Sequence, residues 1–420
     1  MAAKRWTVGM SLMAWSAFAA CVPCQTGRAR IDVRVLNFDV PQINSEPAGI
    51  SADGSRVVVN GPGAVACYDV PSRTYTFIAR PAGSTSATAV AISGDGTVVI
   101  GTAMITENDE GGVPRSRRRI WTSVNGEPAN FISIHPAFPN YSCFDVNQDG
   151  MLIGGWFYDA SNVFQHSFRY NVLSGAYFDL VPPNGWAGAA SSLTDDGSIM
   201  AGSVTQGNGY RAAVWLGNSH LPQLLPQGAF SSDGVSAISG DGRWVAQQGP
   251  ASGLGYTAFI YDRSTDEYLE PGVFGDIRPD SLRQIESVEG SPGGFVAVGA
   301  DQSMTPARWG PGQHPLNLWT LFHDRVPECS TWWWMTVQAM SKDGRFIVGQ
   351  RGASGAGASA WVVDLGCLAD IDGDGFLTGL DFDAFVRAFE AGDSIANYDT
   401  LGGITGMDFD AFVQDFESGC

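Results

Sequence analysis

The chain has 420 residues, of which 43 are acidic and 24 are Lys or Arg, and its formal net charge is −19. This length allows one large domain or two ordinary ones. An acidic surface excludes nucleic acid as an expected partner, because phosphate binding needs clustered Lys and Arg. Beyond the N-terminus, no run approaches the roughly 20 apolar residues that a membrane-spanning helix needs, so we expect no transmembrane segment in the mature chain.

The first predicted element is a secretory signal peptide over residues 1–20. Lys4 and Arg5 precede an apolar run that ends in small residues near Ala20, which is the pattern of an export signal. Export predicts a secreted or extracellular cell-surface protein in which cysteines can pair. The alternative is a lipoprotein anchored at Cys21, although the residue three positions earlier is Phe where Leu is usual.

One short motif recurs along residues 48–364 and indicates the fold of this region. Each copy has an apolar strand, a Ser, Thr or Asn, one further residue, Asp-Gly, and a second apolar strand. Asp-Gly between two apolar runs is a strong hairpin signal, because Gly tolerates positive φ. The motif Asp is present in six copies and is missing from a degenerate copy near Gly293: Asp53, Asp95, Asp149, Asp196, Asp241 and Asp343. Spacings of 42 to 54 residues are typical of propeller blades.

The strands that follow the turns complete each predicted blade. A third strand ends near an aromatic residue in every copy: Tyr68, Trp121, Tyr170, Trp215, Tyr261, Trp309 and Trp361. A fourth strand, such as 74–78 or 316–321, follows six copies, and residues 33–38 can supply the one that the seventh lacks. We therefore predict a mostly β fold, a seven-bladed β-propeller over residues 31–366 closed by its N-terminal strand. A β-sandwich array is the alternative, but it leaves the missing strand unexplained.

These repeats resemble the HAF-type extracellular repeats of secreted bacterial proteins, whose units pair an Asp-Gly turn with an aromatic-ended strand. The resemblance covers about 320 residues and implies an extracellular propeller. Many propeller families share this pattern, so it does not identify a ligand.

The repeat region contains little local catalytic chemistry. Its histidines show no metalloprotease spacing, and no Gly-x-Ser-x-Gly motif marks a hydrolase nucleophile. The repeated Asp residues lie in tight turns, where their expected role is to cap backbone amides. Residues 145–150 match the first half of a calcium loop but fall in register with the other turns, so we interpret them as a blade hairpin. The missing motifs disfavour an enzyme. Because propeller enzymes gather catalytic residues from separate blades, an enzyme nevertheless stays an open alternative.

Two further features are candidates for carbohydrate contacts. Four arginines within residues 115–119 could bind sulfate or carboxylate groups of a polysaccharide, or they could belong to an exposed hairpin arm. The run Trp332, Trp333 and Trp334 could stack on sugar rings. Strand alternation, however, buries either Trp333 or its two neighbours.

Residues 370–392 and 397–419 are nearly the same unit written twice at an offset of 27. A calcium loop of twelve residues supplies oxygens from positions 1, 3, 5, 7, 9 and 12. The first copy offers five side chains and one carbonyl, which belong to Asp370, Asp372, Asp374, Phe376, Thr378 and Asp381. The second offers Asn397, Asp399, Thr405 and Asp408 but has Leu401 at position 5. We therefore expect the second loop to keep its shape and to bind the ion weakly or not at all.

Each loop is followed by a predicted helix with one apolar face. Phe382, Phe385 and Phe389 recur at helical spacing, and the second copy repeats this stripe from Phe409. The pattern predicts a small helical domain over residues 367–420, which carries 11 of the 19 net negative charges, instead of a solvated acidic tail. So small a core usually needs a metal or a disulfide. A disulfide between Cys367 and Cys420 would tie the ends of the domain together.

This layout resembles the GC-type dockerin of secreted bacterial proteins, named for a terminal Gly-Cys, here Gly419-Cys420. The resemblance covers about 54 residues, and Leu401 departs from it. It implies a calcium-dependent module that binds a cohesin-like or cell-surface protein. The sequence thus predicts a secreted, non-enzymatic propeller that presents a binding surface, with polysaccharide as its candidate ligand. The alternative is a carbohydrate-active hydrolase or lyase that degrades polysaccharide and is carried by the same module.

Overall fold

The computed structural model describes residues 31–36, 44–108, 112–132, 134, 140–158, 165–180, 187–206, 209–226, 234–251, 255–269, 279–288, 294–301, 305–310, 315–353, 357–372, 376–400 and 403–418. The predicted signal peptide and the alternative lipid anchor at Cys21 lie outside these residues. No helix within the described ranges is long and apolar enough to cross a membrane.

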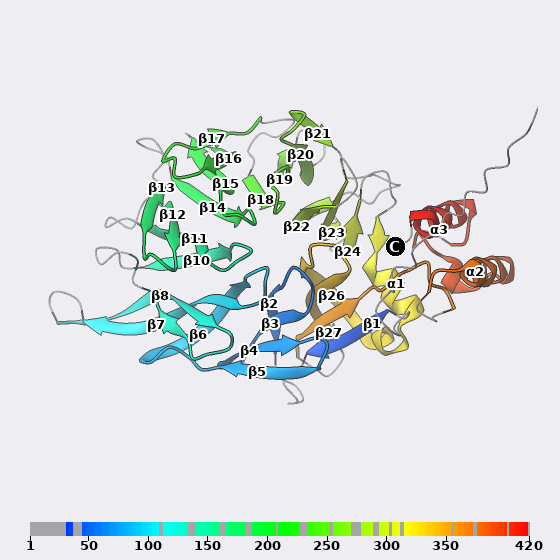
Figure 1. Ribbon diagram of the computed structural model, residues 1–420, viewed down its shortest axis with the longest axis horizontal. Helices are drawn as coiled ribbons and strands as arrows, with labels where there is room; N and C mark the ends of the chain where they lie inside the picture. Colours follow the sequence, from blue (N-terminus) through cyan, green and yellow to red (C-terminus); the bar gives the residue numbers. More distant parts are fainter. Residues whose placement is uncertain are drawn as a thin grey trace, which may run out of the picture.

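Residues 32–364 form a seven-bladed β-propeller, built from seven four-stranded antiparallel sheets in the described part of the chain (Figure 1). From the inner to the outer strand, blades one to three are β2 (Glu46–Ile50), β3 (Arg56–Gly61), β4 (Ala64–Asp69), β5 (Thr74–Ile78); β6 (Ser84–Ile92), β7 (Val98–Asn108), β8 (Pro114–Val124), β9 (Asn130–Phe131); and β10 (Tyr141–Val146), β11 (Leu152–Tyr158), β12 (Gln165–Asn171), β13 (Tyr177–Leu180). Blades four to six are β14 (Gly188–Leu193), β15 (Ile199–Gln206), β16 (Gly209–Leu216), β17 (Gln223–Leu224); β18 (Gly234–Ile238), β19 (Trp244–Ala251), β20 (Gly255–Asp262), β21 (Glu267–Leu269); and β22 (Pro279–Ser287), β23 (Phe295–Asp301), β24 (Pro306–Trp309), β25 (Leu316–Asn317).

Blade seven combines the two ends of the repeat region. It consists of β26 (Trp332–Met340), β27 (Phe346–Ala353), β28 (Ser359–Asp364) and the N-terminal strand β1 (Asp32–Leu36). β1 pairs with β28 in an antiparallel register that sets Asp32 opposite Asp364 and Leu36 opposite Ala360. The predicted closure by the N-terminal strand is therefore confirmed.

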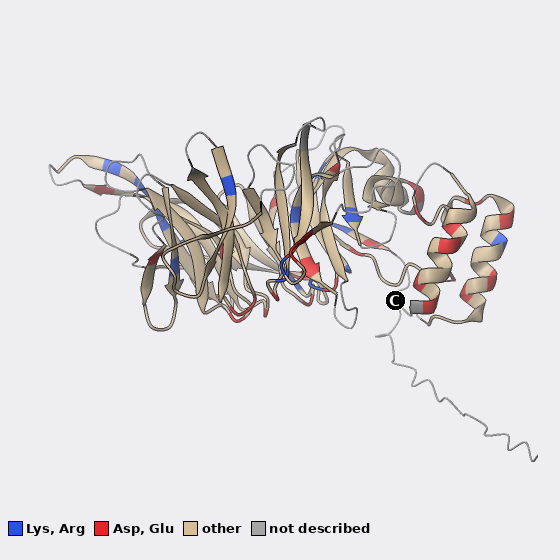
Figure 2. Ribbon diagram, turned by 90° about the horizontal axis from the view of Figure 1, so that it is seen from above, with Lys and Arg blue, Asp and Glu red and all other residues tan. Residues whose placement is uncertain are grey.

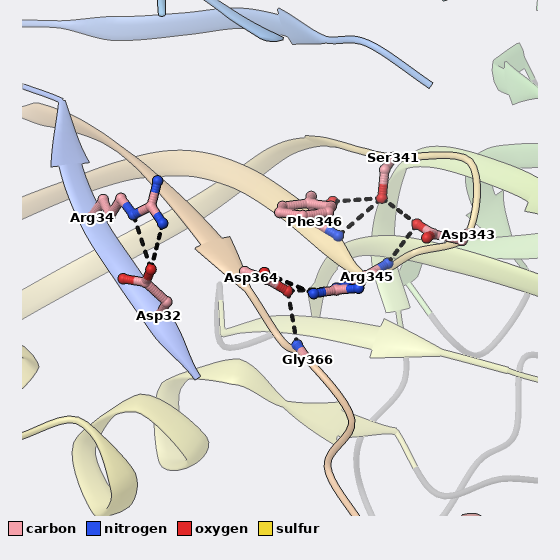
Figure 3. A network of polar contacts seen from close by, with 8 residues as sticks. All are labelled: Asp32, Arg34, Ser341, Asp343, Arg345, Phe346, Asp364 and Gly366. Atoms are coloured by element: carbon pink, nitrogen blue, oxygen red, sulfur yellow. Dashed lines mark hydrogen bonds and ion pairs between the residues drawn. The ribbon is translucent and has the colours of Figure 1, made fainter. Parts of the chain in front are cut away.

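The Asp-Gly turns are built as the sequence predicts, and blade seven shows their chemistry (Figure 3). Ser341 Oγ donates to Asp343 Oδ1 over 2.5 Å, and the same carboxylate oxygen accepts the Arg345 amide at 3.0 Å. Gly344 follows with φ of 70°, a conformation that residues with a Cβ rarely adopt. The motif Asp thus caps backbone amides, and the hairpin interpretation of residues 145–150 is also confirmed, since they join β10 to β11.

The aromatic residues that end the third strands fill the core between blades. Trp121, Trp215, Trp309 and Trp361 are at most 1% exposed. Burying such a side chain contributes about 1.5–3 kcal/mol or more. The motif therefore recurs because every blade must bury one face against its neighbour.

One predicted strand is mostly helical. Residues 316–321 form only the two-residue strand β25, and the chain then enters α1 (Leu318–Arg325) and η1 (Pro327–Thr331). Asn317 ends the strand because its Oδ1 accepts the Thr320 amide at 3.0 Å and caps the helix. This capping bond is the local signal that strand periodicity misses.

The C-terminal region is helical and packs around its own core. It contains α2 (Gly379–Ala391), η2 (Ser394–Ala396) and α3 (Gly406–Ser418). Phe385 and Phe412 are fully buried between the helices. Acidic residues recur along α2 and α3 (Figure 2), and the two helices lie beside α1 at the edge of the ring (Figure 1).

Candidate functional site

Three carboxylates of the first loop converge ahead of α2. Asp370, Asp372 and Asp381 each place one oxygen within 4.8 Å of the others. They occupy positions 1, 3 and 12 of the predicted calcium loop. Asp370 and Asp381 are buried, and Asp372 is exposed. Asp374, the predicted ligand at position 5, lies outside the described residues.

Backbone hydrogen bonds hold the position-12 carboxylate in place. Asp381 Oδ1 accepts the Asp372 amide at 3.1 Å, and Oδ2 accepts the Thr378 amide at 2.8 Å. Thr378 Oγ1 in turn accepts the Leu380 amide at 3.1 Å, so it begins α2 as its N-cap. Asp381 therefore closes the loop on the helix and points its carboxylate at Asp372 and Asp370.

The second loop has the same backbone connections. Asp408 accepts the Asp399 amide at 3.1 Å and the Thr405 amide at 2.7 Å. Asn397 Oδ1, at position 1, is buried and has no hydrogen-bond partner in the described structure. Leu401 lies outside the described residues. The second loop thus keeps the shape of the first while carrying fewer charges.

The donor set of the first loop fits a hard cation. Three carboxylates so close together repel one another unless a cation compensates their charge. All its placed donors are oxygens, which suits calcium or magnesium better than zinc or copper. The residues that could hold the ion are therefore Asp370, Asp372 and Asp381, while the roles of Asp374 and the Phe376 carbonyl stay predictions.

Cys367, just before the first loop, is in a disulfide. The other described cysteines, Cys67, Cys143 and Cys329, are thiols, so the bonded partner lies outside the described residues. Cys420 also lies outside them. Its pairing with Cys367 stays a prediction.

A cavity of about 460 Å³ occupies the centre of the ring. Every inner strand carries a β-bulge at the same position, and the bulged residues line the cavity: Ala48, Val90, Phe144, Ser191, Ser236, Arg283 and Gln338. Bulges of this kind re-aim side chains and often occur near functional sites. Blades one to three contribute apolar residues to this ring of bulges, and blades four to seven contribute polar ones.

Three carboxylates lie among the described lining residues, and the sequence analysis assigned none of them to a central cavity. Asp145 Oδ2 accepts the Leu193 amide of blade four at 2.9 Å, and Glu286 Oε2 accepts the Gly240 amide of blade five at 2.9 Å. Asp195 pairs with Lys342, whose Nζ reaches across the ring to within 2.6 Å. These contacts join separate blades, so no signal near any one residue could reveal them.

Burial raises the pKa of two of these carboxylates. It raises the pKa of Asp145 to about 7, against hydrogen bonds from the Val146 and Leu193 amides that lower it. It likewise raises the pKa of Glu286 to about 7. Both groups can therefore gain or lose a proton near neutral pH, although each already accepts hydrogen bonds from the blades.

The arginine run lies on a hairpin arm, formed by β7 and β8, which extends beyond the ring at the left of Figure 1. Arg119 pairs with Glu107 at 2.6 Å, and Arg117 approaches the same carboxylate at 3.5 Å. Arg115 and Arg118 are exposed. The arm interpretation of residues 115–119 is confirmed, and the exposed arginines remain candidates for anion contacts.

The three tryptophans of β26 divide between core and surface. Trp332 is 5% exposed, and Trp333 is 67% exposed. Trp334 is partly buried and meets Trp333 edge to face, with ring centroids 6.2 Å apart. The strand register shifts between Trp332 and Trp334, and Trp333 is left exposed as the candidate for stacking on a sugar ring.

No protein-family model matches this chain, and no curated protein matches it either. Solved propellers do resemble it. The β-propeller domain of the Trilobed protease from Pyrococcus furiosus, described as having an open velcro topology, matches with a TM-score of 0.50 at 12% identity over 77% of this chain and 96% of that one. An oligogalacturonate lyase from Vibrio parahaemolyticus gives 0.48 at 9% identity, with 80% and 97% covered. A putative TolB from Agrobacterium tumefaciens gives 0.40 at 14%, with 58% and 88% covered. At such identities the likeness shows the propeller fold alone.

Proposed function

We propose that this chain is a secreted, non-enzymatic propeller that presents a binding surface and is attached through a calcium-dependent, dockerin-like C-terminal module. The observation that carries the proposal is the convergence of Asp370, Asp372 and Asp381 within 4.8 Å. These residues hold positions 1, 3 and 12 of a calcium loop, and position 12 carries Asp, which has a shorter reach, where Glu is usual. The likeness of the two loops in their backbone hydrogen bonds supports a duplicated module.

The ion would order the module. Asp381 ties the loop to α2, and an ion bound to Asp370 and Asp372 would fix the other end of the same loop. Helices as short as α2 and α3, with 13 residues each, are marginal without tertiary support. A folded module then presents its outer surface to a cohesin-like or cell-surface protein, as the dockerin resemblance implies.

Calorimetry of the full chain with calcium tests the metal site. We expect one tight site in the wild type and a loss of affinity of at least about tenfold in Asp372→Ala, because one charged ligand is removed. Asp383→Ala is the matched control, since this carboxylate is exposed on α2 outside the loop, and it should leave the affinity unchanged. Equal calcium heats in Asp372→Ala and the wild type would refute the ligand assignment.

The second candidate is a polysaccharide hydrolase or lyase carried by the same module. The observation that favours it is the presence of Asp145, Asp195 and Glu286 in the lining of one cavity. Acid-base cleavage of a glycosidic bond needs paired carboxylates. A panel of purified polysaccharides, scored for both retention and product release, separates the candidates: retention without products supports the binding protein, and products abolished by Glu286→Gln support the enzyme.

A further inference from the structure

Thr400 marks a difference between the two copies of the module. The offset of 27 sets it at the position that Gly373 holds in the first loop. Thr400 has φ of 60°, which is unfavourable for a β-branched residue. It is nevertheless only 4% exposed. A strained residue at a position suited to Gly persists only where its side chain makes compensating contacts.

The Thr400 hydroxyl makes one such contact with the propeller and one within its own loop. Its Oγ1 accepts the Asn317 amide at 2.8 Å and donates to the Asp399 carbonyl at 2.6 Å. Asn317 ends the outer strand of blade six and caps α1. One hydroxyl therefore connects the second loop with the point where blade six gives way to α1.

A second polar contact lies beside the first. The Tyr398 hydroxyl donates to Asp415 Oδ2 at 2.8 Å. Burial raises the pKa of Asp415, and this effect is opposed by the Tyr398 hydrogen bond and by the positive charge of Arg308 on β24. Arg308 is itself buried enough to lower its pKa, with Asp415 as its largest favourable charge. The hydrogen bond of Asp415 thus lies within the module, while its charge and that of Arg308 attract each other between α3 and blade six.

These contacts belong to the second copy alone. The first copy has Ile371 and Ala388 at the positions of Tyr398 and Asp415, and neither can form a hydroxyl-carboxylate bond. Apolar packing also joins the two domains, because Leu368 lies against both the core shared by blades six and seven and the core of the module. η2 also contacts α1.

We propose that the second loop is an interdomain lock, which fastens the module to blade six through Thr400 and Asp415. The two copies have then diverged in task, because the second serves the propeller and the first remains available for an ion and an external partner. The lock does not depend on what the first loop binds. A fastened module also holds its outer surface in a fixed direction relative to the ring.

Hydrogen exchange in the full chain tests the lock with variants that restore the first-copy residue. Thr400→Gly removes the hydroxyl and relieves the positive-φ strain, so the loop should stay folded, and Asp415→Ala removes the carboxylate. We expect the peptide that contains the Asn317 amide to exchange at least about tenfold faster in both variants. Thr400→Ser keeps the hydroxyl and should retain wild-type protection.

Asp410→Ala is the matched control, because it removes an exposed carboxylate from the same helix. Protection of the Asn317 peptide at the wild-type level in both Thr400→Gly and Asp415→Ala would overturn the proposal. Calcium calorimetry on the same variants separates this result from a failure of the metal site. Because the lock does not depend on the first loop, Thr400→Gly and Asp415→Ala should leave the calcium affinity at the wild-type level. Absence of calcium binding in the wild type and in all variants would refute the metal site without affecting the lock.

Discussion

Phe385 and Phe412 stack face to face, with ring centroids 4.0 Å apart and an angle of 4° between their planes. They occupy equivalent positions of the two copies. The surrounding contacts also come in matched pairs: Phe385 lies 6.1 Å from Phe409, and Phe382 lies 6.0 Å from Phe412. A contact between equivalent residues lies on a local two-fold axis. The duplication has therefore produced one shared core instead of two separate units.

This stack makes the module sensitive to a single truncation. Phe385→Ala removes a fully buried ring and should destabilise the α2-α3 pair by about 3–5 kcal/mol. Hydrogen exchange should show faster opening of α2 and α3 while the propeller strands keep their protection. Leu380→Ala is the control, because that side chain of α2 is 59% exposed, and an equal effect of both substitutions would argue against the stack as the centre of the core.

Calcium removal should act on the module before the propeller. An ion that binds only the folded module at about 100 times its dissociation constant adds roughly 2.7 kcal/mol of stability. With a chelator, we expect an early unfolding transition that far-ultraviolet circular dichroism reports as loss of helix. A melting curve that does not change on chelation would contradict a stabilising ion.

The cavity carboxylates should make the propeller less stable as the pH rises toward neutrality. The pKa of Asp145 and of Glu286 is about 7 in the folded chain, against ordinary values of 3.8 and 4.5. The folded state therefore holds their protons more tightly. Their contribution is fully present below about pH 4 and is lost as the pH rises through about 7.

Asp145→Asn should flatten this dependence, since the amide stays neutral at every pH. Between pH 4 and pH 8, we expect the melting temperature of the wild type to fall by about 2 °C or more relative to that of Asp145→Asn. Asp410→Asn, which alters an exposed carboxylate, should show no such trend. Parallel curves for Asp145→Asn and the wild type would mean that Asp145 titrates normally.

The N-terminal strand should contribute strongly to the stability of the ring. Leu36 is 1% exposed and packs in the core shared by blades seven and one, so Leu36→Ala should cost about 2–5 kcal/mol. Leu173→Ala is the same change at a side chain that is 76% exposed and should be nearly neutral. Denaturant unfolding of both variants measures the difference, and similar midpoints would show that β1 is dispensable.

The sequence predicts those features whose cause is local. Asp343 and Gly344 form their turn through neighbours within three residues, and Trp361 reports a strand that must bury one face. The number of strands in the repeats also predicts that β1 completes blade seven. The contact of Asp145 with Leu193 and that of Thr400 with Asn317 join residues 48 and 83 positions apart. Such pairs depend on how blades and helices come together, and no periodicity encodes them.

The pairing of β1 with β28 also sets an order of events during synthesis. Ribosomes add about 5–20 residues per second, so β1 emerges tens of seconds before the strand that it joins. During that interval blades one to six can form while the first strand keeps an open edge, which is prone to pair with other chains. The ring can therefore close only in a chain that has been synthesised as far as β28. A chain interrupted before β28 has no partner for its first strand and is exposed to aggregation and proteolysis.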